Sequence, residues 1–284
     1  MAPSLADPAG HRYRAIDASI HTPGTYDARG PMAGLRIREC LRQPEPQIDL
    51  MSLRICVIGD SIAAGTGDSR CLGWHGRLLG PLLQGGRDVT IYDLGVRGET
   101  SQDVARRWQA EASTRLPSIF RAAVVFEFGL NDCTVRTSAD GRAARRVAVE
   151  ETLATTAAIL AGAVALWPTM MIGPAPVDDR RGGPQLVPGI EQRTRNADIH
   201  ALDSRLAAVA AGVGVAYLSV FDALATDQRW QRALRDGDGI HPVDGGYDAL
   251  AALVGGWAPW RALIDGAAPG VPTQDDPGEE GEGP

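Results

Sequence analysis

The feature that most constrains the fold of this chain is a regular alternation of short and long hydrophobic segments. Short apolar runs with many β-branched residues recur along its middle, and they predict strands buried on both faces, as in a parallel sheet. Longer stretches with helical periodicity separate these runs, and strict alternation of this kind predicts a doubly wound α/β fold. The predicted strands are 53–58, 89–94, 122–128, 169–172 and 214–218, and the predicted helices are 74–83, 101–116, 143–166, 190–211 and about 247–264.

The predicted topology also indicates where a functional site lies. Right-handed crossovers place the carboxyl ends of parallel strands along one edge of the sheet. In open sheets of this kind the ligand binds at that edge, in the loops that follow the strands. We therefore expect the functional residues of this chain in the loops after its predicted strands.

The two ends of the chain differ in composition from the alternating region. Residues 1–50 mix Pro, Gly, Arg and Asp with weak periodicity, and the first strong strand begins just after Met51, so we expect a poorly ordered or loosely attached N-terminal extension. Residues 266–284 are acidic and rich in Pro and Gly, and they bury too little apolar surface to offset their ordering entropy. The prediction is therefore a folded α/β domain over residues 51–265, followed by a disordered tail.

Charge and hydropathy exclude several classes of function. The chain has 28 basic and 35 acidic residues, a formal net charge of −7, which disfavours binding to nucleic-acid phosphates and to anionic lipid. Its N-terminus has no apolar signal-peptide core, and the most apolar run, 157–167, is shorter than the about 20 residues that span a bilayer. We expect a cytoplasmic protein that acts on a small molecule, without nucleic acid and without stable membrane insertion.

The four cysteines do not indicate a metal site or a disulfide scaffold. Cys40, Cys56, Cys71 and Cys133 lack the close spacing of zinc ribbons and redox pairs. Cys71 and Cys133 adjoin predicted site loops and could approach each other, although free thiols are the expected state in a reducing compartment. The sequence does not indicate whether they pair.

The loop after the first predicted strand offers a candidate nucleophile. Gly59 permits a tight turn as the strand ends, and Ser61 follows at the mouth of the sheet, close to backbone N–H donors. The ordinary interpretation of such a segment is an N-capping serine beside a turn aspartate. The G-x-S-x-G elbow of α/β-hydrolases is absent, since Ala63 occupies the place of its second glycine.

The late segment Asp238-Gly-Ile-His241-Pro offers a base for that serine. Histidine accepts a proton near neutral pH, and an aspartate three residues earlier can turn back to hold the imidazole tautomer. Pro242 favours an extended backbone at His241, so the ring is expected at the end of a loop. The rival base is His75, which lies close to the Ser61 loop but has no carboxylate at a comparable spacing.

Two further loops offer donors for a developing oxyanion. Gly98, in the segment 95–101 after the second strand, has a backbone N–H that could face the reacting carbonyl, and Asn131, after the third strand, has a side-chain amide. Each motif alone is ordinary loop chemistry. The four together, at one edge of the predicted sheet, indicate an active site.

These four blocks, in this order, resemble the SGNH (GDSL) hydrolase family, which is named for its Ser, Gly, Asn and His residues. The resemblance covers about residues 52–264, and the segment 59–78 is similar to a bacterial subgroup of GDSL-type lipases. It implies a flavodoxin-like three-layer α/β/α sandwich with a central five-stranded parallel sheet. A departure from the family pattern is Asp93, where the second block often carries an asparagine.

The resemblance also implies roles for individual residues. Ser61 would be the nucleophile, His241 the base and Asp238 its orienting carboxylate, while the Ser61 N–H, the Gly98 N–H and the Asn131 side chain would form the oxyanion hole. It implies no metal and no organic cofactor. The predicted function is hydrolysis of carboxylic esters through an acyl-serine; deacetylation of carbohydrates and cleavage of thioesters use the same machinery, and a non-catalytic binding module is the alternative from another class.

One charged segment lies outside these blocks. Arg142, Arg145 and Arg146 stand at the start of the predicted helix 143–166, and Glu150 and Glu151 follow within that helix. Charges of opposite sign at this spacing predict a solvated helix surface.

Overall fold

The core of the fold is a sheet of five parallel strands, in which β1 pairs with β2 and β3, and β6 pairs with β3 and β8. The computed structural model describes residues 49–181 and 191–266. The predicted tail beyond residue 266 and all but the last two residues of the predicted N-terminal extension lie outside this described part. The strands are β1 (Asp49–Gly59), β2 (Val89–Gly95), β3 (Phe120–Glu127), β6 (Thr169–Ile172) and β8 (Ala216–Leu218).

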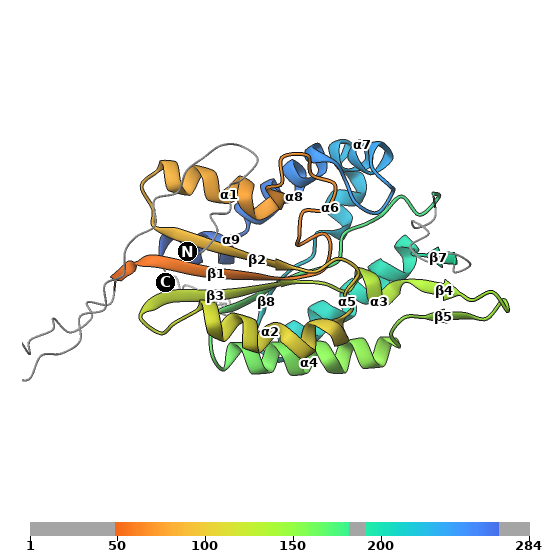
Figure 1. Ribbon diagram of the computed structural model, residues 1–284, viewed down its shortest axis with the longest axis horizontal. Coiled ribbons are helices and arrows are strands. Elements are labelled where there is room, and N and C mark those ends of the chain that lie inside the picture. The colour runs from red at the N-terminus through yellow and green to blue at the C-terminus, as the bar shows by residue number, and fades with distance from the viewer. Residues whose placement is uncertain (1–48, 182–190, 267–284) are drawn as a thin grey trace, which may run out of the picture. The chain divides into compact units, whose positions relative to one another are not determined.

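The strand order is β2-β1-β3-β6-β8, the flavodoxin-like order, with helices on both faces of the sheet (Figure 1). The predicted three-layer α/β/α fold is therefore confirmed. One face carries α1 (Gly73–Gln84), α8 (Asp244–Gly256) and α9 (Ala258–Asp265), and the other carries α2 (Ser101–Arg115), α4 (Val149–Val164) and α5 (Asn196–Gly212).

Alternate residues of β1 show why its central stretch, Ile55–Ile58, is apolar. Successive side chains of a strand point to opposite faces. Ile55 and Val57 pack in the core beneath α1, α8 and α9, whereas Cys56 and Ile58 pack in the core beneath α2, α4 and α5. Because both faces are covered here, this stretch has no polar side.

A second sheet projects from the carboxyl edge of the first as an arm (Figure 1). It is antiparallel, with the order β5-β4-β7, and consists of β4 (Val135–Thr137), β5 (Ala143–Arg145) and β7 (Glu191–Arg193). The predicted helices 143–166 and 190–211 are therefore wrong at their starts, which are strands β5 and β7. Strands of three residues are too short for a local pattern, and their pairing joins segments distant in sequence.

The C-terminal region also differs from the prediction. The single predicted helix 247–264 is two helices, α8 and α9, separated at Trp257. Gly255 and Gly256 weaken the end of α8, and Pro259, which lacks a backbone N–H, stands in the first turn of α9. Two helices that the sequence pattern did not indicate, α6 (Phe221–Thr226) and α7 (Gln228–Asp236), precede α8. Across residues 49–181 and 191–266, no helix is long and apolar enough to cross a membrane.

Candidate active site

The four predicted blocks meet at the carboxyl edge of the main sheet. Ser61 follows the end of β1, Gly98 follows β2, and Asn131 lies in the short helix α3 (Leu130–Cys133) directly after β3. Asp238 and His241 lie in the loop between α7 and α8. The site therefore combines residues from both ends of the described domain.

Ser61, His241 and Asp238 form a continuous hydrogen-bonded row. His241 Nε2 lies 2.7 Å from Ser61 Oγ, and His241 Nδ1 lies 2.7 Å from Asp238 Oδ2. An ionised carboxylate only accepts hydrogen bonds, so it holds the proton on Nδ1 and leaves the Nε2 lone pair facing the serine hydroxyl. This arrangement can withdraw the hydroxyl proton when Ser61 attacks.

The loop that carries Asp238 is held in place by its own backbone. Asp238 Oδ1 accepts hydrogen bonds from the N–H groups of Ile240, at 2.9 Å, and His241, at 2.7 Å. Burial opposes ionisation of Asp238, but the hydrogen bonds from the His241 ring and backbone outweigh it and hold the pKa of this carboxyl well below its usual range. Asp238 therefore stays negatively charged beside the imidazole.

The segment 178–181, which follows β6, contacts the turn that carries Asp238. Arg181 donates to the carbonyl oxygens of Arg235, at 2.7 Å, and Gly237, at 2.9 Å, where α7 ends. The backbone N–H of Asp178 donates to Gly239 O at 2.8 Å. The segment 178–181 thus supports the Asp238–His241 turn.

The orientation of the Asn131 amide follows from its two partners. Arg146 Nη1 donates to Asn131 Oδ1 at 3.1 Å, and a guanidinium has no acceptor, so the oxygen must face it. Asn131 Nδ2 donates one hydrogen to Asp60 Oδ2 at 3.2 Å, which leaves its second N–H for a ligand. Within the described residues, the backbone N–H groups of Ser61 and Gly98 also have no hydrogen-bond acceptor.

Gly98 has a φ of +79°, in the left-handed region that favours glycine. Arg146 Nη2 donates to Gly98 O at 2.7 Å, so one guanidinium connects the Gly98 loop with Asn131. The solvated helix surface predicted for the arginines is therefore wrong: Arg146 is half-buried between two site loops, and Arg145 pairs with Asp198. The sequence pattern did not reveal these contacts of Arg146, because antiparallel pairing, not helical spacing, places the residue.

Asp132, next to Asn131, links α3 to the helices on either side. Its buried carboxylate accepts hydrogen bonds from the Ser101 backbone N–H at 3.0 Å, from the Ser101 hydroxyl and from Thr152 Oγ1 at 3.0 Å. The contact satisfies a free N–H at the start of α2 and complements the positive end of that helix. The Gly98 and Asn131 loops are thereby fixed relative to each other.

Two acidic side chains are buried beneath the turn that carries Ser61. Burial raises the pKa of Asp60 to about 6, although the hydrogen bond from Ile62 N opposes the rise. Burial raises the pKa of Glu127 to about 8 against the hydrogen bond from Trp74 Nε1, which lies 2.7 Å from Oε2. Glu127 Oε1 has no partner among the described residues. Trp74 is fully buried, so it belongs to the core and does not line a substrate pocket.

Gly59 must be glycine because β1 ends very close to β3. A Cβ atom at this position would lie 1.9 Å from Glu127 O and 2.9 Å from the Ala63 Cβ. The Asp60 backbone N–H donates to the same Glu127 carbonyl at 3.2 Å. The turn that carries Ser61 therefore packs directly on the end of β3.

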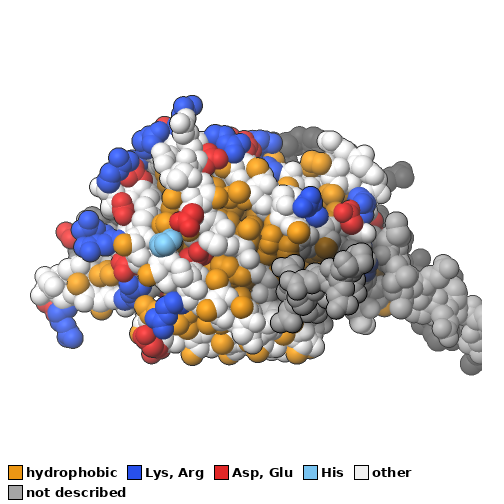
Figure 2. All heavy atoms as spheres, turned by 180° about the vertical axis from the view of Figure 1, so that it is seen from behind, with side chains coloured by type: hydrophobic (Ala, Val, Ile, Leu, Met, Phe, Trp, Pro, Cys, Tyr) orange, Lys and Arg blue, Asp and Glu red, His pale blue; other side chains and the backbone are white. Residues whose placement is uncertain are grey.

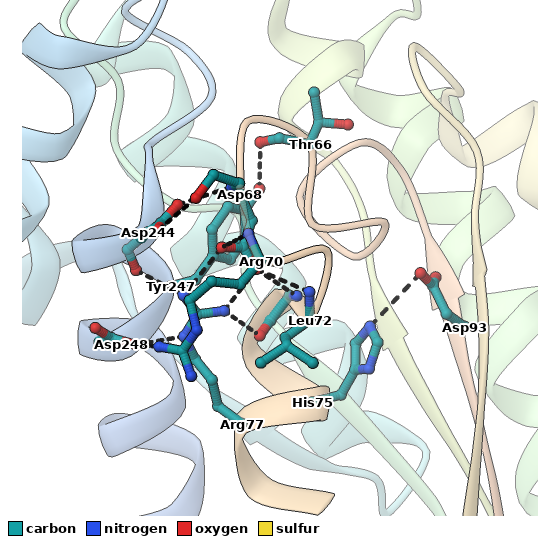
Figure 3. Close-up of polar contacts among 12 residues, drawn as sticks. Thr66, Asp68, Arg70, Leu72, His75, Arg77, Asp93, Asp244, Tyr247 and Asp248 are labelled. Carbon is teal, nitrogen blue, oxygen red and sulfur yellow. Dashed lines mark hydrogen bonds and ion pairs between the residues drawn. The ribbon is translucent and has the colours of Figure 1, made fainter. Parts of the chain in front are cut away.

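The rival base His75 does not contact Ser61 by a hydrogen bond. Its Nε2 lies 3.2 Å from Ala63 O and 3.7 Å from Asp93 Oδ2, and Figure 3 shows the ring directed toward Asp93. Asp93 also accepts a hydrogen bond from Gly95 N at 2.9 Å. Asp93, the departure from the family pattern, thus fixes its own strand end and a neighbouring helix.

Neither a metal centre nor a disulfide is built from the described side chains. Cys71 is exposed, Cys133 is buried, and both are free thiols. Within residues 49–181 and 191–266, no group of three or more His, Cys, Asp or Glu residues is arranged to hold a metal ion.

A buried ion pair joins the segment after Ser61 to helix α8 (Figure 3). Asp68 accepts hydrogen bonds from Arg77 Nη1 at 2.6 Å and Nη2 at 3.0 Å, and Arg77 Nη2 donates to Asp244 O at 3.0 Å. Ser69 donates to both carboxylate oxygens of Asp244, at 2.8 and 2.7 Å. We call these four residues, Asp68, Ser69, Arg77 and Asp244, the Asp68–Arg77 clamp.

The Asp68–Arg77 clamp holds the loop after Ser61 close to the turn that carries His241. A Cβ atom at Gly67 would lie 2.8 Å from Pro242 O and 3.5 Å from the His241 Cβ, so the clamped loop packs directly on the histidine turn. Tyr247, on α8, donates to Thr66 O at 2.7 Å. The segments that carry Ser61 and His241 are therefore held together close to these two side chains.

A family model decides which class of protein this geometry belongs to. The model of the GDSL-like lipase/acylhydrolase family matches residues 57–249, more than half of the chain. The chain belongs to this family. As a member of the GDSL-like family it is an enzyme, a hydrolase that acts on ester bonds.

Several solved structures share the fold of the chain. The lipase/acylhydrolase from Enterococcus faecalis is 24% identical, with a TM-score of 0.54, and the match covers 77% of this chain and 98% of that chain. TesA is 24% identical, with a TM-score of 0.51, and the match covers 71% and 95%. Axe2, an acetylxylan esterase from Geobacillus stearothermophilus, is 18% identical, with a TM-score of 0.51, and the match covers 73% and 94%. No curated protein matches the chain.

Proposed function

We propose that this GDSL-family hydrolase cleaves carboxylic esters through an acyl-serine intermediate on Ser61. The observation that carries the proposal is the row Ser61 Oγ, His241 imidazole and Asp238 carboxylate, with both hydrogen bonds at 2.7 Å. A protein that only binds a ligand has no need of a serine, a base and an orienting carboxylate in one row.

In the proposed reaction His241 Nε2 takes the Ser61 proton as Oγ attacks the carbonyl carbon. The carbonyl oxygen becomes an oxyanion, which would accept hydrogen bonds from the Ser61 N–H, the Gly98 N–H and the free N–H of Asn131. When the intermediate collapses, the protonated imidazole gives its proton to the departing alcohol. A water molecule, deprotonated by His241, then releases the acid and regenerates Ser61.

The identity of the ester is a separate part of the proposal. The same residues would cleave a sugar acetate or an acyl thioester, because only the leaving group differs. A panel of 4-nitrophenyl esters from acetyl to long acyl chains, acetylated xylooligosaccharides and acyl-coenzyme A thioesters separates these substrates by kcat/KM. We expect the highest kcat/KM with one of the 4-nitrophenyl esters, rather than with the sugar acetate or the thioester.

The mechanism is tested with a fluorophosphonate probe and 4-nitrophenyl acetate. We expect the probe to label Ser61, and Ser61→Ala and His241→Ala to lower kcat by at least about 10³-fold while the circular dichroism spectrum stays unchanged. Ser118→Ala is the matched control, since Ser118 is exposed and lies before β3, at the opposite edge of the sheet. Retention of wild-type rates by Ser61→Ala would refute the mechanism.

A further inference from the structure

One face of the arm combines several arginines with uncharged side chains. Directly opposite residues of an antiparallel pair point to the same face. Arg136 pairs with Ala144 on one side and with Gln192 on the other. The Arg146 backbone N–H donates to Thr134 O at 2.9 Å, which continues the same register by one more pair. Arg136 and Arg146 therefore lie on a common face.

The hairpin turn extends this face by one more arginine. Ser138 N donates to Arg142 O at 2.9 Å, so these two residues form the next pair on the same side as Arg136. We call this side of the arm the arginine face. It consists of Thr134, Arg136, Ser138, Arg142, Ala144, Arg146, Gln192 and Thr194.

The arginine face has cationic groups without anionic partners. Among the residues that the structure describes, no carboxylate lies within 4.0 Å of the guanidinium groups of Arg136, Arg142 or Arg146, whereas Arg145, on the opposite face, pairs with Asp198 at 2.7 Å. Burial lowers the pKa of Arg146, and the charge of Arg136 lowers it further, against the opposing charges of Asp103, Asp132 and Asp60. An excess of positive charge on a chain with a net charge of −7 is therefore concentrated at one place.

The arginine face adjoins the candidate oxyanion pocket. Its innermost member, Arg146, contacts both Asn131 Oδ1 and Gly98 O, while Arg136 and Arg142 are exposed farther out along the hairpin. Figure 2 shows basic side chains, interspersed with acidic ones, at the end of the described domain where the arm projects. With about 3.3 Å per residue along a strand, Arg136 and Arg142 stand roughly 7–13 Å beyond Arg146.

We propose that the arginine face binds an anionic group of the substrate, so that the preferred ester carries a carboxylate or phosphate that extends from its reacting carbonyl toward Arg136 and Arg142. This inference rests on the proposed function, because it assigns the substrate class of the same site. Arg136 and Arg142 present guanidinium forks that match the two oxygens of such a group. Arg146 remains a positioning residue for the oxyanion donors.

The test compares matched charged and neutral esters with the charge on either side of the scissile bond. The mono-4-nitrophenyl ester of adipic acid and 4-nitrophenyl hexanoate differ in the acyl group, and 4-acetoxybenzoate and 4-acetoxybenzamide differ in the leaving group. The readout is the ratio of kcat/KM for the charged and the neutral ester. Each ratio is compared between the wild type and a variant, so that the intrinsic reactivity of the ester cancels.

We expect the wild type to favour the charged member of at least one pair. In the Arg136→Gln/Arg142→Gln variant, the ratio of kcat/KM for the charged and the neutral ester should be about tenfold lower. The loss should shrink at 0.5 M NaCl, because salt screens exposed charges. Arg193→Gln is the matched control: Arg193 pairs with Val135 and so lies on the opposite face of the same sheet. An unchanged ratio in the double variant, or an equal loss in Arg193→Gln, overturns the inference.

A binding measurement separates this inference from the proposed function. In the Ser61→Ala background, isothermal titration with the charged and neutral esters gives affinities that do not depend on turnover. Tighter binding of a charged ester, abolished by the Arg136→Gln/Arg142→Gln changes, supports the arginine face even if another residue were the nucleophile. Equal affinities for charged and neutral esters overturn the arginine face and leave the acyl-serine mechanism intact.

Discussion

Removal of the Arg77 guanidinium should destabilise the protein strongly, because it leaves a buried carboxylate without its counter-ion. The Asp68 side chain is fully buried and that of Arg77 is 6% exposed. After the change Arg77→Met, Asp68 keeps the N–H groups of Leu72 and Gly73, both at 2.9 Å, but loses both guanidinium contacts. Breaking a buried ion pair in this way costs about 3–5 kcal/mol of the free energy of unfolding.

For a domain of this size, that loss lowers Tm by roughly 6–20 °C. The measurement is urea and thermal unfolding of the full chain at pH 7, followed by tryptophan fluorescence and circular dichroism. Arg70→Met is the matched control: Arg70 is half-exposed and lies 3.6 Å from the half-exposed Asp248, a surface pair that contributes about 0–1 kcal/mol.

The pair is isolated by a double-mutant cycle with Asp68→Asn, which should give a coupling energy of about 1–3 kcal/mol. The way in which this stabilisation changes with pH follows from the pKa of Asp68. Burial raises this pKa, but the hydrogen bonds from Arg77 and from the backbone outweigh burial and hold the pKa well below its usual range. This stabilisation is complete above the unfolded value of about 3.9 and is lost as the pH falls through the folded value. The reasoning is refuted if Arg77→Met costs no more than Arg70→Met, or if the two clamp changes add without coupling.

Three further outcomes are expected. Arg146→Met should lower kcat for neutral esters by about 10- to 100-fold with KM unchanged, because the oxyanion donors lose their support. Arg146→Lys should not restore kcat. Arg145→Met is the control. Asp238→Asn should lower kcat by about 10³- to 10⁴-fold, because an amide N–H facing Nδ1 moves the imidazole proton to Nε2; a loss below tenfold contradicts this. Glu127→Gln should be more stable than the wild type. The pKa of folded Glu127 is raised to about 8, so between about pH 5 and 8 the folded wild type retains a proton that its unfolded chain releases. The difference in the free energy of unfolding should therefore grow by about 1.4 kcal/mol per pH unit over this range. Urea unfolding at pH 5 and 8 checks the last outcome, and a margin independent of pH would count against it.

The predicted site residues that the structure brings together are those whose placement depends on local rules. Ser61 and Asn131 directly follow strands, and parallel strands bring their carboxyl ends together whatever else the fold contains. Asp238 and His241 are three residues apart, so their contact needs only a turn. Because topology brings the ends of distant segments to one edge, the proximity of these segments could be predicted without knowledge of side-chain packing.

The residues that the sequence did not reveal depend on distant partners. Arg146 is placed by a three-residue strand that pairs across the chain, and the nearby glutamates made the same segment look like a helix. The contact between Arg77 and Asp244 joins residues 167 apart, which no local pattern records. Glu127 did leave a signal, since it is an acidic residue within a predicted strand whose other members are apolar.

The separation of the serine and the histidine along the chain has a consequence for biosynthesis. Ser61 and His241 are 180 residues apart, and the histidine precedes only the last two helices of the described domain. At about 5–20 residues per second, translation delivers the imidazole roughly 9–36 s after the hydroxyl. A nascent chain therefore carries Ser61 without its imidazole partner over this interval, and the acyl-serine chemistry proposed above becomes possible only after His241 has been synthesised.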